Sequence, residues 1–170
     1  DSIPEPDALE KLLDLYAGWP VKRQRCVAFL ACLYSDVEDG VACHGGVFTP
    51  DGIDRAEPAP ETRYYQCHFT IWSGCLYRLA AVREFGLPNQ DYVLDLGEGE
   101  YGYRIMTAGY EGFIDQEARL HHNVGGKSFD LQQVALGPLR FTLLTGPPIR
   151  CYYGCRNMLH FLLYEARRRR

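Results

Sequence analysis

The stretch Val27-Ala-Phe-Leu-Ala-Cys-Leu-Tyr34 is a nearly unbroken run of apolar residues, many of them good strand formers. A half-exposed strand would alternate between apolar and polar residues, whereas this run stays apolar almost throughout. The run therefore predicts a buried strand.

Helical patterns lie on both sides of this strand. Apolar residues at helical spacing predict a helix over Ala8–Tyr16, between the acidic turn Pro4–Asp7 and Gly18. Further helices are predicted at Leu76–Phe85, Glu98–Ala108 and Cys151–Ala166.

Other strands and loops fall between these helices. Strands are predicted at Val41–Phe48 with a break at Gly45-Gly46, and at Tyr64–Trp72, Gly112–Asp115 and Ala118–His121. The stretch Thr49–Arg63 carries three prolines and predicts an exposed loop, and Val124–Lys127 predicts a turn. Because strands and helices interleave, the chain is expected to be a layered α/β protein.

The composition narrows the class of protein. The 170 residues suit one domain with a hydrophobic core, and the formal charge of −4 argues against broad nucleic-acid binding. The only basic run is Arg167–Arg170, which is either a solvated tail or a patch for anionic lipid. No apolar stretch reaches the roughly 18 residues of a membrane-spanning helix.

The seven cysteines do not form a disulfide framework, because their number is odd and their spacing irregular. Cys26, Cys32, Cys67 and Cys75 lie in or beside apolar runs, where a free cysteine behaves as a small buried hydrophobe. A reduced, cytosolic compartment fits this pattern best. The pair Cys151-x3-Cys155 resembles half of a zinc site, so a structural-zinc interaction domain stays open as an alternative.

Acidic residues concentrate in Asp95-Leu-Gly-Glu-Gly-Glu-Tyr-Gly-Tyr-Arg104, at the start of a predicted helix. The helix dipole favours carboxylates there, so capping and charge matching are one interpretation. Capping does not explain the glycines at positions 97 and 99, which leave Glu98 room to face a cleft. A carboxylate in that position suits general-base catalysis on a hydroxyl, the second interpretation.

A series of short motifs adds to this local evidence. In chain order they are Trp72-Ser73-Gly74, Gly86-Leu87-Pro88, the acidic helix start with Arg104, Ala108-Gly109-Tyr110, His122-x-x-Gly125 and Tyr152-Tyr153-x-x-Arg156-Asn157. Together they resemble the second half of bacterial family-2 glycosyltransferases, especially the rhamnosyl- and galactofuranosyl-transferase-like members. The resemblance runs from about Asp1 to Leu163.

The resemblance implies a fold and a division of the chain. It implies part of the GT-A fold, a mixed sheet flanked by helices, with the nucleotide-binding βαβ half expected upstream of Asp1. Residues 1–148 would form the acceptor-side part of that domain, and residues 149–170 a helical extension that packs on it or touches a membrane surface. These residues alone are expected to be inactive.

The resemblance also assigns roles to the acidic segment and to the tryptophan loop. The family's catalytic base stands six positions before the helix arginine, which places Glu98 in that role opposite Arg104. Glu100 would bind the acceptor or orient Arg104, and Asp95 is the reserve candidate for the base. Trp72, Ser73 and Gly74 would line the acceptor sugar, although core packing is the alternative for Trp72.

A divalent cation, Mg or Mn, is the cofactor that the resemblance implies. In the family it neutralises the diphosphate leaving group, the role of a Lewis acid. The corresponding metal ligands here would be Asp1, as the last residue of an Asp-x-Asp-like motif, and His122. His121 fits the family's His-x-x-Gly pattern less well.

The expected activity is therefore inverting transfer of a sugar from a nucleotide-diphosphate donor to a hydroxyl of a glycan or lipid-linked acceptor. The resemblance suggests a role in bacterial cell-surface polysaccharide synthesis, in the cytoplasm and in peripheral contact with the inner face of the cell membrane. A non-catalytic carbohydrate-binding or scaffold module is the main alternative. A hydrolase is less favoured, because Glu98 and Glu100 lie on one short segment and are poorly placed to flank a bond.

Overall fold

The computed structural model describes residues 2–37, 40, 42–50, 52–58, 60–123, 130–136, 139–145 and 147–165; for Cys43 and for residues 130–136 and 139–145 it describes the backbone. The chain divides into two compact units. The first unit comprises Asp1–Asn89 and Glu98–Asn123, and the second comprises Gln90–Gly97 and Val124–Arg170. Each is described by itself.

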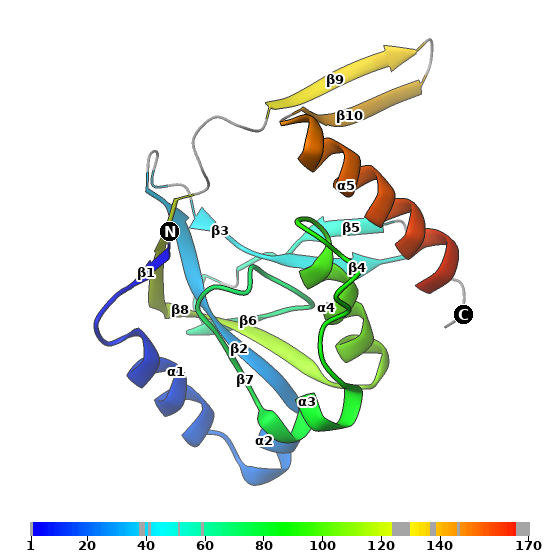
Figure 1. The fold of residues 1–170 in the computed structure, drawn as a ribbon. Coiled ribbons are helices and arrows are strands. Elements are labelled where there is room, and N and C mark those ends of the chain that lie inside the picture. Colours follow the sequence, from blue (N-terminus) through cyan, green and yellow to red (C-terminus); the bar gives the residue numbers. More distant parts are fainter. Residues whose placement is uncertain are drawn as a thin grey trace. The chain divides into compact units, whose positions relative to one another are not determined.

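A mixed, curled sheet forms the centre of the first unit (Figure 1). Its two long strands, β2 (Val27–Asp36) and β8 (Glu111–His122), run parallel to each other. All other pairs in this sheet are antiparallel: β1 (Ser2–Pro4) and β6 (Tyr64–Cys67) pair with β8, while β3 (Ala42–Cys43) and β7 (Cys75–Tyr77) pair with β2. A separate hairpin joins β4 (Gly46–Thr49) to β5 (Gly52–Arg55).

Helices cover both faces of this sheet. Helix α1 (Ala8–Ala17) packs on one face, where Leu12 and Leu15 meet Leu30 of β2. Helices α3 (Leu79–Phe85) and α4 (Gly97–Thr107) pack on the other face, where Phe29 joins the core. Neighbouring strand residues point to opposite faces, so the apolar run in β2 supplies both cores at once. The short helix α2 (Val21–Cys26) leads into β2.

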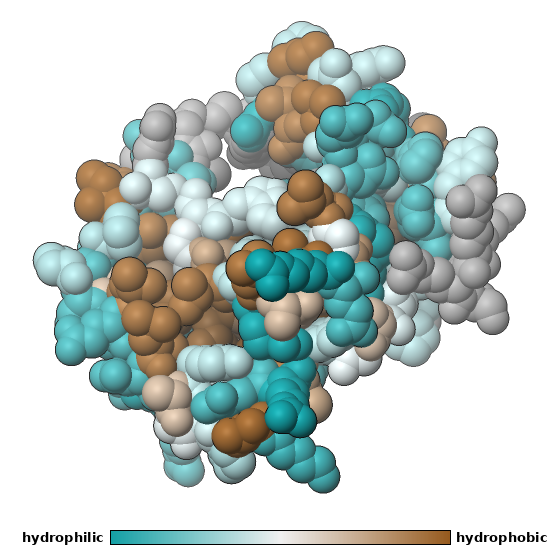
Figure 2. Space-filling model, turned by 60° about the horizontal axis from the view of Figure 1, so that its bottom comes forward, coloured by the Kyte–Doolittle hydropathy of each residue, from teal (hydrophilic) through white to brown (hydrophobic). Residues whose placement is uncertain are grey.

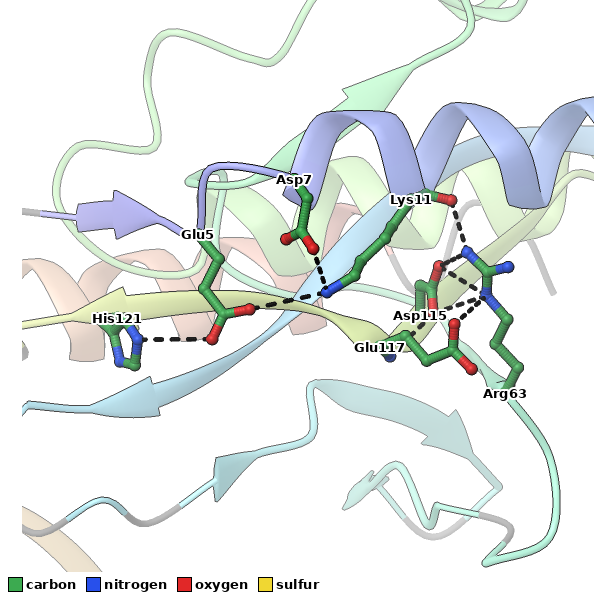
Figure 3. Close-up of polar contacts among 7 residues, drawn as sticks. All are labelled: Glu5, Asp7, Lys11, Arg63, Asp115, Glu117 and His121. Carbon is green, nitrogen blue, oxygen red and sulfur yellow. Dashed lines mark hydrogen bonds and ion pairs between the residues drawn. The ribbon is translucent and has the colours of Figure 1, made fainter.

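An ion-pair cluster fixes a bulge in β8 (Figure 3). The carboxylate of Asp115 is fully buried, and Arg63 donates to it at 2.8 Å through Nη2. The same Nη2 also donates to the carbonyl oxygen of Lys11 in α1, and Asp115 accepts a bond from the backbone of Glu117. Since a buried charge needs a partner, Arg63 ties helix α1 to the bulge at the point where the register of β8 shifts.

The second unit contains a hairpin and the C-terminal helix. Strands β9 (Asp130–Leu136) and β10 (Leu139–Thr145) pair antiparallel. Helix α5 (Pro148–His160) begins with a proline in its first turn and continues into a π-helical segment η1 (Phe161–Glu165). The loop before Gly97 belongs to this unit, and Asn157 of α5 holds it.

Several expectations from the sequence are confirmed. The α/β class is correct, as are the buried strand at Val27–Tyr34 and the helices at Ala8–Tyr16 and Glu98–Ala108, each within two residues at its ends. The Gly45-Gly46 break is also correct, since β3 ends before it and β4 begins at Gly46.

Four expectations are wrong in part. The predicted helix Leu76–Phe85 begins only at Leu79, because Leu76 pairs with Leu30 in the sheet. The predicted loop Thr49–Arg63 contains β5. The two strands predicted between Gly112 and His121 are one strand with a bulge. The predicted strand at Tyr64–Trp72 ends at Cys67. The predicted turn Val124–Lys127 lies outside the described residues, and the boundary near residue 148 stays a prediction.

The described helices contain no stretch that is long and apolar enough to cross a membrane. The six cysteines whose side chains are described are free thiols, and Cys32 and Cys67 are buried as expected. Cys26 is exposed at the end of α2, which corrects its assignment to a buried run.

Candidate functional site

Two acids of the segment Asp95–Arg104 lie at the start of α4. Glu98 and Glu100 both lie in its first turn, where the positive end of the helix dipole favours carboxylates. Gly102, one turn later, sits against the backbone of His68, and a Cβ there would overlap the carbonyl oxygen of His68. A glycine is therefore needed for α4 to lie close to the loop that follows β6.

Glu100 is buried and is paired with Arg104 one turn along the helix. Its two carboxylate oxygens accept from Nε of Arg104 at 2.6 Å and from Nη2 at 3.2 Å. The same guanidinium donates to the carbonyl oxygens of Phe85 and Leu87, at the end of α3. Only 2% of Glu100 is exposed, so this geometry favours the orienting role over contact with an acceptor.

Tyr101 joins α4 to the tryptophan loop. Its ring centroid lies 5.3 Å from that of Trp72 and 5.8 Å from that of Tyr77. Its hydroxyl donates to the carbonyl oxygen of Gly86 at 2.8 Å, and the guanidinium of Arg104 lies over its ring. The indole of Trp72 keeps 36% of its surface exposed, so one part of it packs in an aromatic cluster while another faces solvent.

Glu98 is within electrostatic reach of the strand that follows the tryptophan loop. Burial raises the pKa of the Cys75 thiol well above its ordinary value, and the charges of nearby groups, Glu98 among them, raise it further. Burial likewise raises the pKa of Tyr77, with Glu98 again a contributor. The structure therefore brings the predicted base and the loop Trp72–Gly74 into one neighbourhood of the first unit.

Gly74 connects this neighbourhood to the end of β8. Its φ of +71° is in the left-handed region, and a Cβ there would come within 3.1 Å of Leu120. Leu120 stands two residues before His122 and therefore points to the same face of the strand. Ser73 lies in the same turn, which precedes β7.

His122 lies between two neighbouring strands. On one side its Nδ1 is 2.6 Å from Oγ of Ser2, and on the other its Cα partner in β2 is Asp36. His121 points to the other face, where its Nε2 is 3.8 Å from a carboxylate oxygen of Glu5 (Figure 3). Asp1 lies outside the described residues. No local pattern pointed to Asp36, which only the pairing of β2 with β8 places beside His122.

His122 and Asp36 together provide part of a cation site. An imidazole that binds a metal through one nitrogen usually has the other nitrogen held by a hydrogen bond, as Ser2 holds Nδ1 here. In the part of the chain that the structure describes, no three His, Cys, Asp or Glu side chains come together as a metal-binding group.

Asp95 lies in the second unit, in the loop that precedes α4. Its Oδ2 atom is buried and accepts no hydrogen bond, an arrangement that costs free energy. Its two neighbours, Leu94 and Leu96, both have positive φ values, of 68° and 66°. Strained backbone of this kind is found disproportionately at functional sites, so Asp95 keeps its place as a candidate.

Two residues of the last sequence motif, Arg156 and Asn157, hold a loop of the second unit. Asn157 is buried and donates to two backbone carbonyl oxygens of the loop, and Arg156 donates to a third, that of Asp91. These contacts give Arg156 and Asn157 a structural role.

No protein-family model matches the chain, and no curated protein is significantly similar to it. The resemblance to glycosyltransferases therefore stays a prediction from the order of the sequence motifs.

Proposed function

We propose that this chain is the acceptor-side half of an inverting glycosyltransferase with a GT-A fold, of the family-2 kind. It would transfer a sugar from a nucleotide-diphosphate donor to a hydroxyl group of a glycan or lipid-linked acceptor. The mixed sheet covered by helices on both faces is compatible with this fold.

One observation carries the proposal: Glu98 and the loop Trp72–Gly74 lie in the same neighbourhood although 24 residues separate Glu98 from Gly74. A transferase of this kind needs a base next to the surface on which the acceptor rests. The half-exposed indole of Trp72 offers an apolar face for a sugar ring, and Gly74 lets the backbone approach.

In the proposed reaction, Glu98 accepts the proton of the acceptor hydroxyl while the hydroxyl oxygen attacks the anomeric carbon. The bond between that carbon and the diphosphate oxygen breaks, and the nucleoside diphosphate leaves with the bonding electrons. A single displacement of this kind inverts the anomeric configuration. Arg104 is held by Glu100 and ties α4 to the end of α3.

A divalent cation would neutralise the charge of the departing diphosphate. Of the described residues, His122 and its strand neighbour Asp36 would hold it, with Asp1 as the further ligand that the sequence suggests. Imidazole and carboxylate ligands suit Mn, and carboxylate also suits Mg.

The first unit also has a surface that suits the donor-binding half of such an enzyme. Among the described residues, β7 has β2 as its one strand partner, so no described strand pairs with its other edge. Beside it lies an apolar pocket of about 210 Å³, whose lining includes Leu13, Leu30 and Leu76. Apolar side chains gather on this face of the unit (Figure 2). A further strand added to β7 would continue the sheet and cover the pocket.

The test is release of nucleoside diphosphate by the protein that contains this chain, with a panel of nucleotide sugars and with Mn or Mg. Glu98→Gln should reduce the rate by about 100-fold or more, because a general base contributes that much. Glu98→Asp should retain part of the rate, since a carboxylate remains. Glu10→Gln, an exposed acid on α1, is the matched control and should have no effect.

Two outcomes would contradict the proposal. One is the absence of metal-dependent release from every donor in the panel. The other is full activity in Glu98→Gln. Glycan binding that survives Glu98→Ala without any transfer would instead support the non-catalytic carbohydrate-binding alternative.

A further inference from the structure

A pocket of about 530 Å³ opens on the first unit beside α2, the short helix that leads into β2 (Figure 1). Its walls come from the turn before α2, from α2 itself and from the first residues of β6 and β8. These segments all belong to the first unit. Four segments that are distant in the chain therefore build one concave surface.

This pocket lies on the side of the sheet that α1 covers. Trp19 of its wall packs into the core under α1 together with Phe113. Tyr101 and Ile105 of α4 pack into the core on the other face of the sheet. The sheet therefore separates the pocket from the neighbourhood of Glu98, and a ligand in it binds apart from the proposed acceptor site.

Arg23 in the wall of the pocket is a half-buried cation without an acidic partner. Its guanidinium lies over three aromatic rings, 5.1 Å from the ring centroids of Trp19 and Phe113 and 5.7 Å from that of Tyr64. Its Nε atom is buried without a hydrogen-bond partner, and among the described residues no carboxylate pairs with the side chain. The rings hold the guanidinium by cation–π attraction, which leaves its Nη donors for a ligand.

Lys22 adds a second cation to the same wall. Helix α2 carries Lys22, Arg23 and Arg25 and no acid, although the chain as a whole has a net charge of −4. Two cations on one side of a concave surface attract an anionic group. A phosphate or a carboxylate suits them, because a guanidinium pairs with either through charge-assisted hydrogen bonds.

The remaining walls indicate what carries the anionic group. Tyr64 and Pro20 present an aromatic ring and a pyrrolidine ring, apolar surfaces on which the C–H face of a sugar can pack. Glu111 lines the pocket as well, and in the part of the chain that the structure describes it forms no ion pair. A carboxylate of this kind accepts hydrogen bonds from hydroxyl groups. A sugar with one phosphate or carboxylate group meets all of these walls.

We propose that the pocket formed by α2, β6 and β8 binds an acidic sugar. The phosphate or carboxylate of the sugar pairs with Arg23 and Lys22, its hydroxyl groups donate to Glu111, and its ring packs on Tyr64 and Pro20. This binding requires no glycosyl transfer, so it can be tested separately from the proposed function.

Trp19 makes the pocket observable by fluorescence. The chain has two tryptophans, so Trp72→Phe leaves Trp19 as the one indole and removes any signal from the loop Trp72–Gly74. Glucose 6-phosphate and glucuronate are titrated into the full chain with this substitution. Both should cause a saturable change in tryptophan fluorescence. Their affinity should exceed that of glucose, and that of inorganic phosphate at equal ionic strength, by about tenfold or more.

Substitutions in this background test the role of each wall. Arg23→Gln should weaken binding by about tenfold or more, because hydrogen bonds to a charged group are lost. Lys22→Gln should weaken it by about two- to fivefold, and its exposed position keeps this test independent of the packing around Arg23. Glu111→Gln should strengthen binding of inorganic phosphate, because a like charge is removed. Arg83→Gln, which removes an exposed charge from α3, is the matched control and should bind like the unchanged background.

Four outcomes would overturn the proposal. The first is the absence of a saturable change with both acidic sugars, and the second is an affinity no higher than that of glucose. The third is unchanged affinity in Lys22→Gln. The fourth is an equal affinity for inorganic phosphate, since the pocket would then bind an anion without recognising a sugar.

Discussion

The buried side chain of Asn157 in α5 donates a hydrogen bond to the carbonyl oxygen of Asp95, at 2.6 Å. The same amide nitrogen donates to the carbonyl oxygen of Val93 at 3.0 Å. The C-terminal helix thus fixes the backbone of the loop that leads into α4, in which two leucines have positive φ values. A loop held in this way keeps a strained conformation that its own residues do not favour.

Asn157→Ala should release this loop. Two carbonyl oxygens lose their donor, so the free energy of unfolding should fall by about 1–3 kcal/mol. Amide hydrogen exchange of residues 91–96 should accelerate, which a thermal melt alone would not reveal. Met158→Ala, at the next and more exposed position of α5, is the control and should leave exchange in the loop unchanged. Unchanged exchange in Asn157→Ala would show that the loop keeps its conformation without this contact.

Glu100 and Arg104 should behave as one structural unit. Either Glu100→Ala or Arg104→Ala leaves a partly or fully buried charge without its partner, at a cost of about 3–5 kcal/mol of unfolding free energy. The double variant should cost clearly less than the sum of the two single variants, because the second change removes the stranded charge. Urea denaturation measures all three, and additive values would disprove the coupling.

Gly102 should not tolerate a methyl group. In Gly102→Ala the new Cβ overlaps the backbone of His68, and backbone cannot move aside at low cost. We expect a loss of roughly 1–3 kcal/mol or more, the range for overpacked cores. Gly154→Ala in α5 is the matched helical control, because nothing lies within 4 Å of its Cβ. This control should stabilise the protein by up to about 1 kcal/mol, the difference in helix propensity. An unchanged melting temperature for Gly102→Ala would contradict the packing of α4 on the loop after β6.

His68 should make the protein sensitive to mild acid. Burial lowers the pKa of His68 below the ordinary 6.5, and its Nδ1 accepts a hydrogen bond from the backbone of Phe48 at 2.7 Å. As the pH falls below 6.5, the unfolded chain binds a proton at this histidine before the folded chain does, so stability falls with it.

His68→Asn should flatten this dependence, because an amide oxygen can replace the acceptor and does not titrate. His121→Gln, which changes a more exposed histidine, should leave the dependence in place. Denaturation midpoints measured from neutral pH down to mild acid compare the variants. An equally steep fall in His68→Asn would assign the sensitivity to other groups.

The sequence predicted the parts of the site whose roles depend on residues close together in the chain. The acids, glycines and arginine of Glu98–Arg104 indicated a helix start, and the structure has α4 there. The sequence predicted only in part that Glu98 and Glu100 have different roles, because the difference depends on which side chain is buried. Glu100 turns inward onto Arg104, a contact within one helix, but its burial depends on α3 and on the sheet behind it.

The sequence by itself determined the α/β class, the buried strand β2 and the ends of α1 and α4, since apolar periodicity and glycine act over a few neighbouring residues. Tertiary structure decided what depends on partners distant in the chain. Leu76 is in a strand because Leu30 offers it an edge, and β8 is one bulged strand because Arg63 meets Asp115 from 52 residues away. Asp36 stands beside His122 for the same reason. Hydrogen-bond pairing between strands and the pairing of buried charges are long-range interactions, and a local pattern does not specify the partner.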